Sequence, residues 1–406
     1  METMTKEMLA PPLRFKAFKA NWQKLKLNQI LETNVSKNKK GFYKKEQMLS
    51  VSSSAGVVNQ IEYHGRSYAG VSVLPYNILC KAQVVYTKSP LKEYPYGIIK
   101  FNDFEDGIVS TLYAIYDVFE NHDGLYVDYY FQHPVRLNKY LKPLVNIGAK
   151  NDMKVNNDVV LSGSVVFPSL PEQQKIASFL TSVDKKIQQL TKKVELLKEY
   201  KKGVMQKIFS QEIRFKDENG IDFPDWEDVG GNILFNNISD KKHNSDLPIL
   251  AITQNQGAVP RDLIDYRITV TAKSVESYKV VQVGDFVISL RTFQGGIEYS
   301  NYKGICSPAY IVLRPTTENV DRTFYKFYLK TSRYIKQLQK NLEGIRDGKM
   351  ISYKYFSEIK LPYPSIQEQK KISSFLTSID DKVEKVEFQL EQTQQFKKSL
   401  LQQMFV

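Results

Sequence analysis

The chain has 406 residues, 42% hydrophobic and 12% aromatic, which is enough for two or more domains with apolar cores. Its formal net charge of +13 favours a polyanionic partner, nucleic acid ahead of a membrane surface. The sequence has no apolar run that could cross a bilayer, no apolar stretch typical of a signal peptide at its start, and no CxxC pair, since Cys80 and Cys306 stand alone. We therefore expect a cytoplasmic protein without a membrane contact, a disulfide framework or a zinc site.

The first part of the chain alternates β-branched and aromatic residues with glycine-bearing turns, which predicts a β-rich domain. Met48–Val58 (MLSVSSSAGVV) is expected to form a strand followed by a polar loop that closes on Gly56. Asn77–Lys81 (NILCK) is expected to be a strand that ends in a basic residue. A flexible basic run suits DNA phosphates, with a solvated loop as the alternative: Lys37, Lys39, Lys40, Lys44 and Lys45.

A long helix is predicted to follow Pro168. Ser169 and Glu172 have the spacing of a capping box, in which the serine accepts from a helix amide and the glutamate reaches back to the cap amide. Apolar residues then recur in steps of four and three over about three heptads, the pattern of a coiled-coil seam: Ile176, Leu180, Val183, Ile187, Leu190, Val194 and Leu197. A strict count of seven would next place Lys201 in the seam, so we predict a stutter through Tyr200 to Val204.

The segments that follow this helix repeat those that precede it, although more faintly than the helix itself. We therefore predict a second domain that shares the plan of the first but differs in its polar loops. The pairs of similar segments are Leu13–Trp22 with Ile213–Trp226, Met48–Val58 with Ile249–Val259, Asn77–Lys81 with Val287–Arg291, and Gly107–Tyr116 with Gly304–Leu313.

The stretch Pro364–Asp380 (PSIQEQKKISSFLTSID) is nearly identical to Pro168–Asp184 (PSLPEQQKIASFLTSVD). Ser365 and Glu368 again fit a capping box. The same stutter is predicted here, with the seam passing through Phe396 to Leu400 instead of Lys397. The predicted second seam contains Ile372, Leu376, Ile379, Val383, Val386 and Leu390. Two helices with matching seams most simply pack on each other; packing of each seam on its own domain is the alternative. Capping gives no role to the duplicated Gln173 and Gln369, which we assign to a subunit or interdomain surface.

The polar loops carry side chains suited to the edges of bases, because arginine pairs with guanine, and asparagine or glutamine with adenine. An ordinary role in a turn is the alternative for each of them. The candidates in the first domain are Ser52, Ser53, Ser54, Asn59, Gln60, Lys81 and Gln83. Those in the second domain are Thr253, Gln254, Asn255, Gln256, Arg261, Arg291, Thr292 and Gln294. Arg346 and Lys349 are candidate phosphate contacts, mirrored by Lys150 and Lys154.

An enzyme would need a constellation of reactive side chains, and the sequence has no recognisable one. A phosphate-binding P-loop, a glycine-rich turn for S-adenosylmethionine and an Asp/Asn-Pro-Pro-aromatic tetrad are all missing. The four histidines lack ligand spacing, and the E-x-K in Ser357–Lys360 lacks an acidic partner. We expect no catalysis, metal or cofactor in this chain, so chemistry must come from partners.

This layout resembles the specificity subunit of type I restriction–modification systems over essentially the whole chain. The motifs that carry the resemblance are the duplicated P-x-x-x-E-Q-x-K-I, the FPDW at Phe223–Trp226 and GDFVISLRTFQGG at Gly284–Gly296. The first domain departs from it, since it lacks FPDW and the Gly-Asp pair. The resemblance implies an α+β fold with a pseudo-twofold repeat: target-recognition domains at 1–167 and 213–363, separated by long antiparallel coiled-coil helices at 168–212 and 364–406.

The resemblance also implies a function. Each domain recognises one half of a split double-stranded DNA target that contains an adenine, and the helices bind two methyltransferase subunits, which use S-adenosylmethionine. A restriction subunit, where one joins, uses ATP and Mg²⁺. The alternative is a coiled-coil DNA-binding scaffold or transcription regulator without an enzyme partner. Copurification with a methyltransferase would favour the specificity subunit over this alternative. A fused restriction enzyme is disfavoured by the missing catalytic motifs.

The length of the two long helices is predicted to set the gap, meaning the number of unrecognised base pairs between the two half-sites. A helix of about 40 residues is about 60 Å long, which spans at most about 18 base pairs. A second copy of Lys207–Ser210 inserted after Ser210 adds about 6 Å, so the half-sites should stay unchanged while the gap grows by about one or two base pairs. Genome-wide mapping of methylated sites would measure this, and an unchanged gap with full activity would contradict it.

Overall fold

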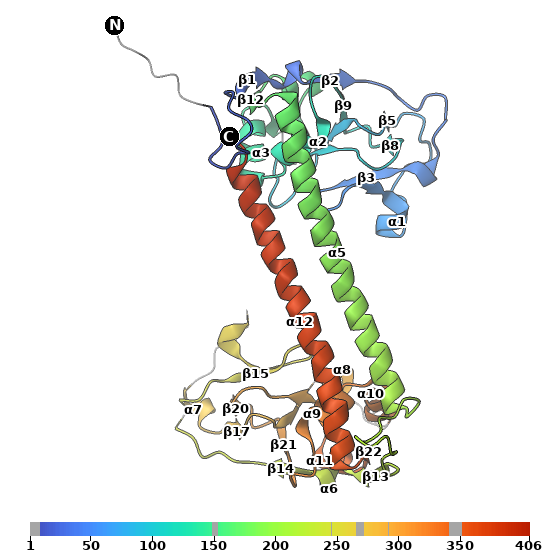
Figure 1. The fold of residues 1–406 in the computed structure, drawn as a ribbon, viewed down its shortest axis with the longest axis vertical. Coiled ribbons are helices and arrows are strands. Elements are labelled where there is room, and N and C mark those ends of the chain that lie inside the picture. Colours follow the sequence, from blue (N-terminus) through green and yellow to red (C-terminus); the bar gives the residue numbers. More distant parts are fainter. Residues whose placement is uncertain (1–8, 148–152, 245, 265–271, 291, 341–350) are drawn as a thin grey trace. The chain divides into compact units, whose positions relative to one another are not determined.

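The computed structural model describes residues 9–147, 153–244, 246–264, 272–290, 292–340 and 351–406. The chain forms two compact units, the first made of Met1–Thr191 with Phe388–Val406 and the second of Lys192–Glu387. Two long helices, α5 (Leu170–Phe209) and α12 (Ile366–Gln403), contribute to both (Figure 1). Each unit therefore contains the beginning of one long helix and the end of the other.

The first unit is built on a four-stranded antiparallel sheet in the order β2 (Leu31–Asn34), β9 (Ala114–Val118), β6 (Val84–Tyr86) and β7 (Ile99–Phe101). Four two-stranded ladders accompany it: β1 (Gln23–Lys26) with β12 (Ser164–Phe167), β3 (Leu49–Ser52) with β4 (Gly56–Asn59), β5 (Asn77–Leu79) with β8 (Gly107–Val109), and β10 (Asn146–Ile147) with β11 (Met153–Lys154). Its short helices are α1 (Gln60–His64), α2 (Gly124–Phe131), α3 (Pro134–Leu141) and α4 (Asn157–Leu161).

The second unit repeats this topology. Its four-stranded sheet has the order β14 (Phe235–Ile238), β21 (Ile311–Pro315), β18 (Phe286–Ile288) and β19 (Glu298–Tyr299). The ladders are β13 (Glu227–Gly230) with β22 (Lys360–Tyr363), β15 (Leu250–Thr253) with β16 (Gly257–Pro260), and β17 (Lys279–Val281) with β20 (Gly304–Cys306). The helices are α6 (Gly231–Leu234), α7 (Ala272–Val275), α8 (Thr292–Gly295), α9 (Arg322–Tyr328), α10 (Ser332–Lys340) and α11 (Tyr353–Glu358). The predicted α+β fold, with two β-rich units and two long helices, is confirmed.

The strand registers correct one predicted equivalence. Val84 of β6 pairs with Tyr116, and Phe286 of β18 pairs with Leu313 at the same place in the matching sheet. The counterpart of β18 is therefore β6, whereas Asn77–Leu79 corresponds to β17, so the alignment of Asn77–Lys81 with Val287–Arg291 is wrong. Both stretches are short apolar strands followed by a basic residue, and so short a pattern does not distinguish neighbouring strands.

The predicted seams are mostly buried, with Ile187, Leu197 and Leu390 half-buried, and they pack in two ways at once. In the first unit, Ile176 and Leu180 share one core with Trp22, Tyr126 and the helix end at Phe405. In the second unit, the equivalent Ile372 and Leu376 share a core with Phe324 of α9 and with the end of α5. Each long helix therefore packs both on its own β-rich unit and on the other long helix. The packing of the helices on each other and the packing of each seam on its own domain are both present.

The predicted stutter is wrong. Tyr200 and Phe396 are 53% and 51% exposed, and the lysines occupy the seam positions instead. Lys397 Nζ lies 2.6 Å from Asp184 Oδ1 in the first unit, and Lys201 forms the equivalent ion pair with Asp380 in the second. A lysine can lie here because its aliphatic stem packs on apolar neighbours while the ammonium meets a carboxylate of the facing helix. In each unit these pairs place the two helices antiparallel.

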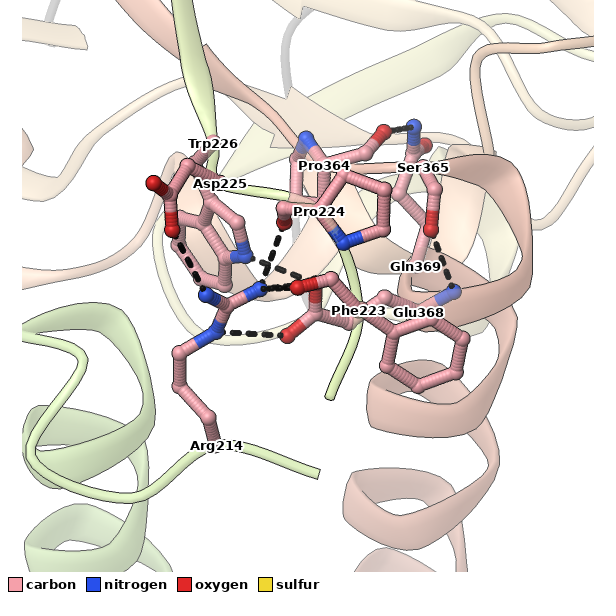
Figure 2. A network of polar contacts seen from close by, with 9 residues as sticks. All are labelled: Arg214, Phe223, Pro224, Asp225, Trp226, Pro364, Ser365, Glu368 and Gln369. Carbon is pink, nitrogen blue, oxygen red and sulfur yellow. Dashed lines mark hydrogen bonds and ion pairs between the residues drawn. The ribbon is translucent and has the colours of Figure 1, made fainter. Parts of the chain in front are cut away.

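The duplicated glutamates bind arginine rather than the cap amide, so their predicted capping role is wrong. Glu172 accepts from Nε and Nη2 of Arg14 at 2.6 and 2.7 Å. Glu368 accepts from Nε and Nη2 of Arg214 at 3.3 and 2.9 Å and from Trp226 Nε1 at 2.9 Å (Figure 2). Both glutamates are buried, so each carboxylate needs these charged partners.

The FPDW motif surrounds the same arginine. Arg214 Nη2 donates to the carbonyls of Phe223 and Pro224 at 3.1 and 2.7 Å, and Nη1 lies 3.3 Å from the carboxylate of Asp225 (Figure 2). Together with the bond from Trp226 to Glu368, these contacts use every residue of the motif. FPDW is therefore explained by the attachment of the second β-rich unit to the start of α12.

The duplicated glutamines are buried inside their own units, so their assignment to a subunit or interdomain surface is wrong. Gln173 donates to the carbonyl of Pro168 at 2.8 Å and accepts from the amide of Asp123 at 3.0 Å. Gln369 makes the equivalent bonds to Pro364 and Asp321, both at 2.8 Å. Because Asp123 and Asp321 cap α2 and α9, each glutamine joins the start of a long helix to the start of a short one.

Candidate nucleic-acid interface

The turn between β15 and β16 presents three polar side chains to solvent. Gln254, Asn255 and Gln256 are exposed, whereas Thr253 shapes the turn by donating to the carbonyl of Gly257 at 3.0 Å and accepting from the amide of Gln256 at 3.1 Å. Gly257 has a φ of +75°, and a Cβ there would lie 2.4 Å from the carbonyl oxygen of Tyr299. The backbone requires glycine here, which fixes the direction in which the three amides project.

The helix α8 adds a fourth exposed amide beside that turn. Gln294 Oε1 accepts from Gln254 Nε2 at 3.3 Å, so the two predicted loops meet. Thr292 is buried and its hydroxyl oxygen accepts from the amide of Ser289 at 2.8 Å, which gives it a role in the framework. Arg291, Arg346, Lys349 and Lys150 lie outside the described residues.

A groove of about 750 Å³ lies next to the turn and is lined by Gln254–Gly257. Its other walls come from β19, α9, the following link to α10 and the parts of α5 and α12 in this unit. The lining cations are Lys198, Lys201, Lys202, Lys326 and Lys330, and the acidic ones are Glu298, Asp380, Glu384 and Glu387. Lys198, Lys201 and Lys330 are paired with Glu387, Asp380 and Glu298, so Lys202 and Lys326 are the better candidates for a phosphate.

The first unit has a matching turn between β3 and β4. Gly56 has a φ of +71°, and the hydroxyl of Ser52 accepts from the amides of Ser54 and Ala55 at 3.3 and 3.2 Å. Ser54 is exposed, while Ser52 and Ser53 are half-buried. The equivalent turns of the two units therefore present serine in one case and carboxamides in the other.

Two predicted contacts of the first unit, Asn59 and Gln60, are used by the framework instead. Asn59 caps α1, with its oxygen accepting from the amides of Ile61 and Glu62. Gln60 is buried, donates to the hydroxyl of Ser50 at 2.9 Å and accepts from the amide of Tyr68 at 2.6 Å. These contacts lie within the first unit, so we leave Asn59 and Gln60 out of the proposed interface.

Gln83 has a structural counterpart in the second unit. It accepts from the amide of Cys80 at 2.7 Å and donates to Asp117 at 2.6 Å. In the second unit, Asp285 accepts from the amide of Gln282 at 2.8 Å and from Arg314 at 2.8 and 2.7 Å. Gln83 therefore replaces the aspartate of the Gly-Asp pair that the first unit lacks, and it also leaves the proposed interface.

The remaining candidates lie at the surface. Lys81 is exposed, and its backbone amide donates to Asp106 at 2.6 Å. Arg261 is half-buried and starts a short 3₁₀ helix after β16. All five residues of the basic run (Lys37, Lys39, Lys40, Lys44 and Lys45) are exposed. They surround the buried Asn38, whose side chain binds the backbone of Tyr43 and Val73, so the run is attached to a folded loop.

The sequence predictions missed an exposed aromatic and basic cluster at the end of α1. His64 makes edge contacts with Tyr63 and Tyr68, at ring distances of 4.9 and 5.6 Å. The guanidinium of Arg66 lies 4.8 Å from the ring of Tyr68. Exposed aromatic rings beside a cation suit stacking on bases. The sequence signal is the pair of tyrosines and the nearby His64 and Arg66 in the stretch Tyr63–Tyr68, which carries no amide side chain.

The residues that the structure describes contain no group of three or more His, Cys, Asp or Glu side chains arranged to hold a metal ion. Among those same residues, no helix is long and apolar enough to cross a membrane.

Comparison with known proteins gives a matching family model and similar curated proteins, two of which are described by their names. Residues 227–393 match the model of the type I restriction modification DNA specificity domain. The relatives come from Methanocaldococcus jannaschii and carry the names of specificity subunits of the type I restriction enzymes MjaX and MjaVIII. Both are 29% identical, over 268 and 265 residues. These matches cover 62% and 58% of this chain, and they span 61% and 60% of the relatives, about three fifths of their length.

Two solved structures share the fold. The S subunit of a type I restriction–modification system from M. genitalium has a TM-score of 0.57 at 14% identity, over 98% of this chain and 99% of that one. A chain from a study of complex assembly and conformational transition of the type I system has a TM-score of 0.53 at 17% identity, over 94% and 95% of the two chains. The duplicated topology thus has precedent along nearly the whole chain.

Proposed function

We propose that this chain, which belongs to the family of specificity subunits of type I restriction–modification systems, selects the DNA on which partner methyltransferase subunits act. Each β-rich unit recognises one half of a split duplex target. The observation that carries the proposal is the repeated topology with different exposed loops: Ser54 in the first unit, and Gln254, Asn255, Gln256 and Gln294 in the second. Equivalent scaffolds with different hydrogen-bonding groups suit two different half-sites.

The charge of the chain supports duplex DNA as the ligand. The net charge is +13, and the exposed lysines of the basic run in the first unit are suited to phosphates. In the second unit, Lys202 and Lys326 line the groove beside the turn. Phosphate contacts of this kind position a protein on the duplex, while the amides of the turns supply the discrimination between bases.

Equivalent exposed aromatic side chains on the two long helices support the proposal that two copies of one partner bind. Tyr200 of α5 and Phe396 of α12 occupy equivalent positions in the repeat, and both are about half exposed, at 53% and 51%. Exposed aromatic side chains are typical of protein interfaces. We assign these positions to two methyltransferase subunits in the cytoplasm, which bring S-adenosylmethionine. A restriction subunit, where one joins the complex, would bring the use of ATP and Mg²⁺.

The chain alone should neither methylate nor cut DNA, because the sequence has no recognisable catalytic constellation. Incubation of the purified chain with duplex DNA and S-adenosylmethionine should give background methyl transfer only. Together with its methyltransferase subunit it should methylate adenine in a bipartite sequence, measured by methylation-aware sequencing. The matched control is the methyltransferase subunit alone, which should show no such sequence preference.

Copurification separates this proposal from a DNA-binding scaffold or regulator. A stable complex with the methyltransferase subunit is expected when the two are produced together. Methyl transfer by the isolated chain, or sequence-specific DNA binding with no association with the methyltransferase, would overturn the proposal.

A further inference from the structure

The side chain of Lys330 contacts both loops that we assign to base recognition in the second unit. Its ammonium donates to the carbonyl of Gln254 at 3.1 Å and to the carbonyl of Gly295 at 2.9 Å. A third bond goes to the carboxylate of Glu298 at 2.5 Å. An ammonium has three donors, so the three acceptors account for all of them.

The acceptors belong to three separate elements. Gln254 lies in the turn after β15, Gly295 ends α8, and Glu298 is in β19, whereas Lys330 lies between α9 and α10. Glu298 is 2% exposed, and burial raises the pKa of its carboxyl group while the charge of Lys330 opposes that rise. A buried carboxylate of this kind holds its cation firmly, since either charge left alone would be costly.

The backbone next to Lys330 packs closely on the residues at the end of α8. Gly296 has a φ of +84°, and a Cβ there would lie 2.2 Å from the carbonyl oxygen of Leu329. A Cβ on Gly295 would lie 3.0 Å from Cγ of Gln254. The turn and the end of α8 thus lie against each other and against the Leu329–Lys330 backbone.

We propose that Lys330 is a positioning residue for sequence recognition by the second unit. It holds the turn of Gln254 and the helix of Gln294 in one arrangement, so that their amides meet the base edges as a single surface, and it does not itself contact DNA. This inference rests on the proposed function, because it assumes that these two loops recognise bases.

The first unit provides a matched comparison. The strand registers make Lys100 equivalent to Glu298, since Lys100 pairs with Val85 and Glu298 with Val287. Lys100 binds Asp128 of α2 at 3.0 Å, so this strand position carries the cation of the pair in the first unit and the anion in the second. This pair joins the sheet to α2, and the bonds of the Lys330 ammonium to a turn and a short helix are the added feature of the second unit.

The test uses the complete complex with its methyltransferase subunits and Lys330→Met. Methylation is measured on the cognate site and on sites with one changed base pair in either half. Discrimination within one half-site should fall by about tenfold or more, while the other half-site keeps its discrimination. The dependence of DNA binding on salt concentration should not change, because Lys330 makes no phosphate contact.

Three further variants separate the explanations. Glu298→Gln keeps an oxygen acceptor but leaves the Lys330 ammonium without its countercharge, so it should lower discrimination in the same half-site, by less than Lys330→Met does. Lys100→Met removes the cation of the buried ion pair between sheet and α2 in the first unit and should leave the half-site of the second unit as it was. If Lys330→Met does not fold, Lys330→Met with Glu298→Leu removes both buried charges and should restore folding without restoring discrimination.

Two outcomes would overturn the inference. A uniform loss of affinity for all sequences, with a smaller salt dependence, would make Lys330 a phosphate contact. A lower melting temperature with both half-sites recognised as before would give it a structural role only. Failure of the proposed function is distinguishable, because the unmodified complex would then show no bipartite methylation at all.

Discussion

Replacing Glu368 with alanine should lower the free energy of unfolding of the second unit by about 3–5 kcal/mol, the usual effect of breaking a buried ion pair from one side. The carboxylate is fully buried and accepts from Arg214 and from Trp226 (Figure 2). Its removal leaves the arginine with the weaker pairing to the exposed Asp225 and leaves the indole donor unsatisfied. The same change also detaches FPDW from the start of α12.

The two tryptophans allow each unit to be measured separately. Trp22 belongs to the first unit and Trp226 to the second, so Trp22→Phe leaves fluorescence that reports on the second unit alone. Urea unfolding of Trp22→Phe, with and without Glu368→Ala, would give the difference in free energy. The matched control is Glu172→Ala, which removes the equivalent carboxylate and should leave the Trp226 transition unchanged. A loss below about 1 kcal/mol would mean that water replaces the carboxylate at Arg214.

The repeat in the sequence was sufficient to predict the fold but not the partners of its charged residues. Hydrophobic spacing identified the seams of α5 and α12, because burial on one helix face leaves a period that a sequence displays directly. The role of Glu368 depends on Arg214, far away along the chain, and no local pattern connects them. A capping box was the local explanation for the same residue types, and the tertiary contact displaced it.

Lys201 and Lys397 illustrate the same limit. A charged residue at a seam position indicates a break in the pattern when only one helix is considered. The facing helix supplies Asp380 and Asp184, and this pairing is visible only once the antiparallel register is known. Polar pairs in a seam are a known means of fixing register, which suits helices that must align two units.

The candidate interface was predictable at the level of loops and unpredictable at the level of side chains. The turns after β3 and β15 were expected, and both present polar groups. Gln60 and Gln83 have the composition of base-recognising residues, yet both are buried and bind neighbouring backbone or carboxylate groups. Glutamine serves either role equally well, so only its surroundings decide.

Gln254→Ala and Gln294→Ala should each reduce discrimination at one base pair by about 1–3 kcal/mol, and both should affect the same half-site. The reason is geometric: each amide is exposed, and the two lie in contact at 3.3 Å on adjoining loops. Because the two side chains are in contact, their effects on the free energy of discrimination should not be additive. A double-mutant cycle measures this coupling. Methylation of sites with single base changes, made by the complete complex, gives the discrimination for each variant.

Ser54→Ala, in the equivalent turn of the first unit, is the matched control and should affect only the other half-site. If Gln254→Ala weakened recognition of both halves equally, the two units could not be independent readers of DNA, and the repeated fold would need a different explanation.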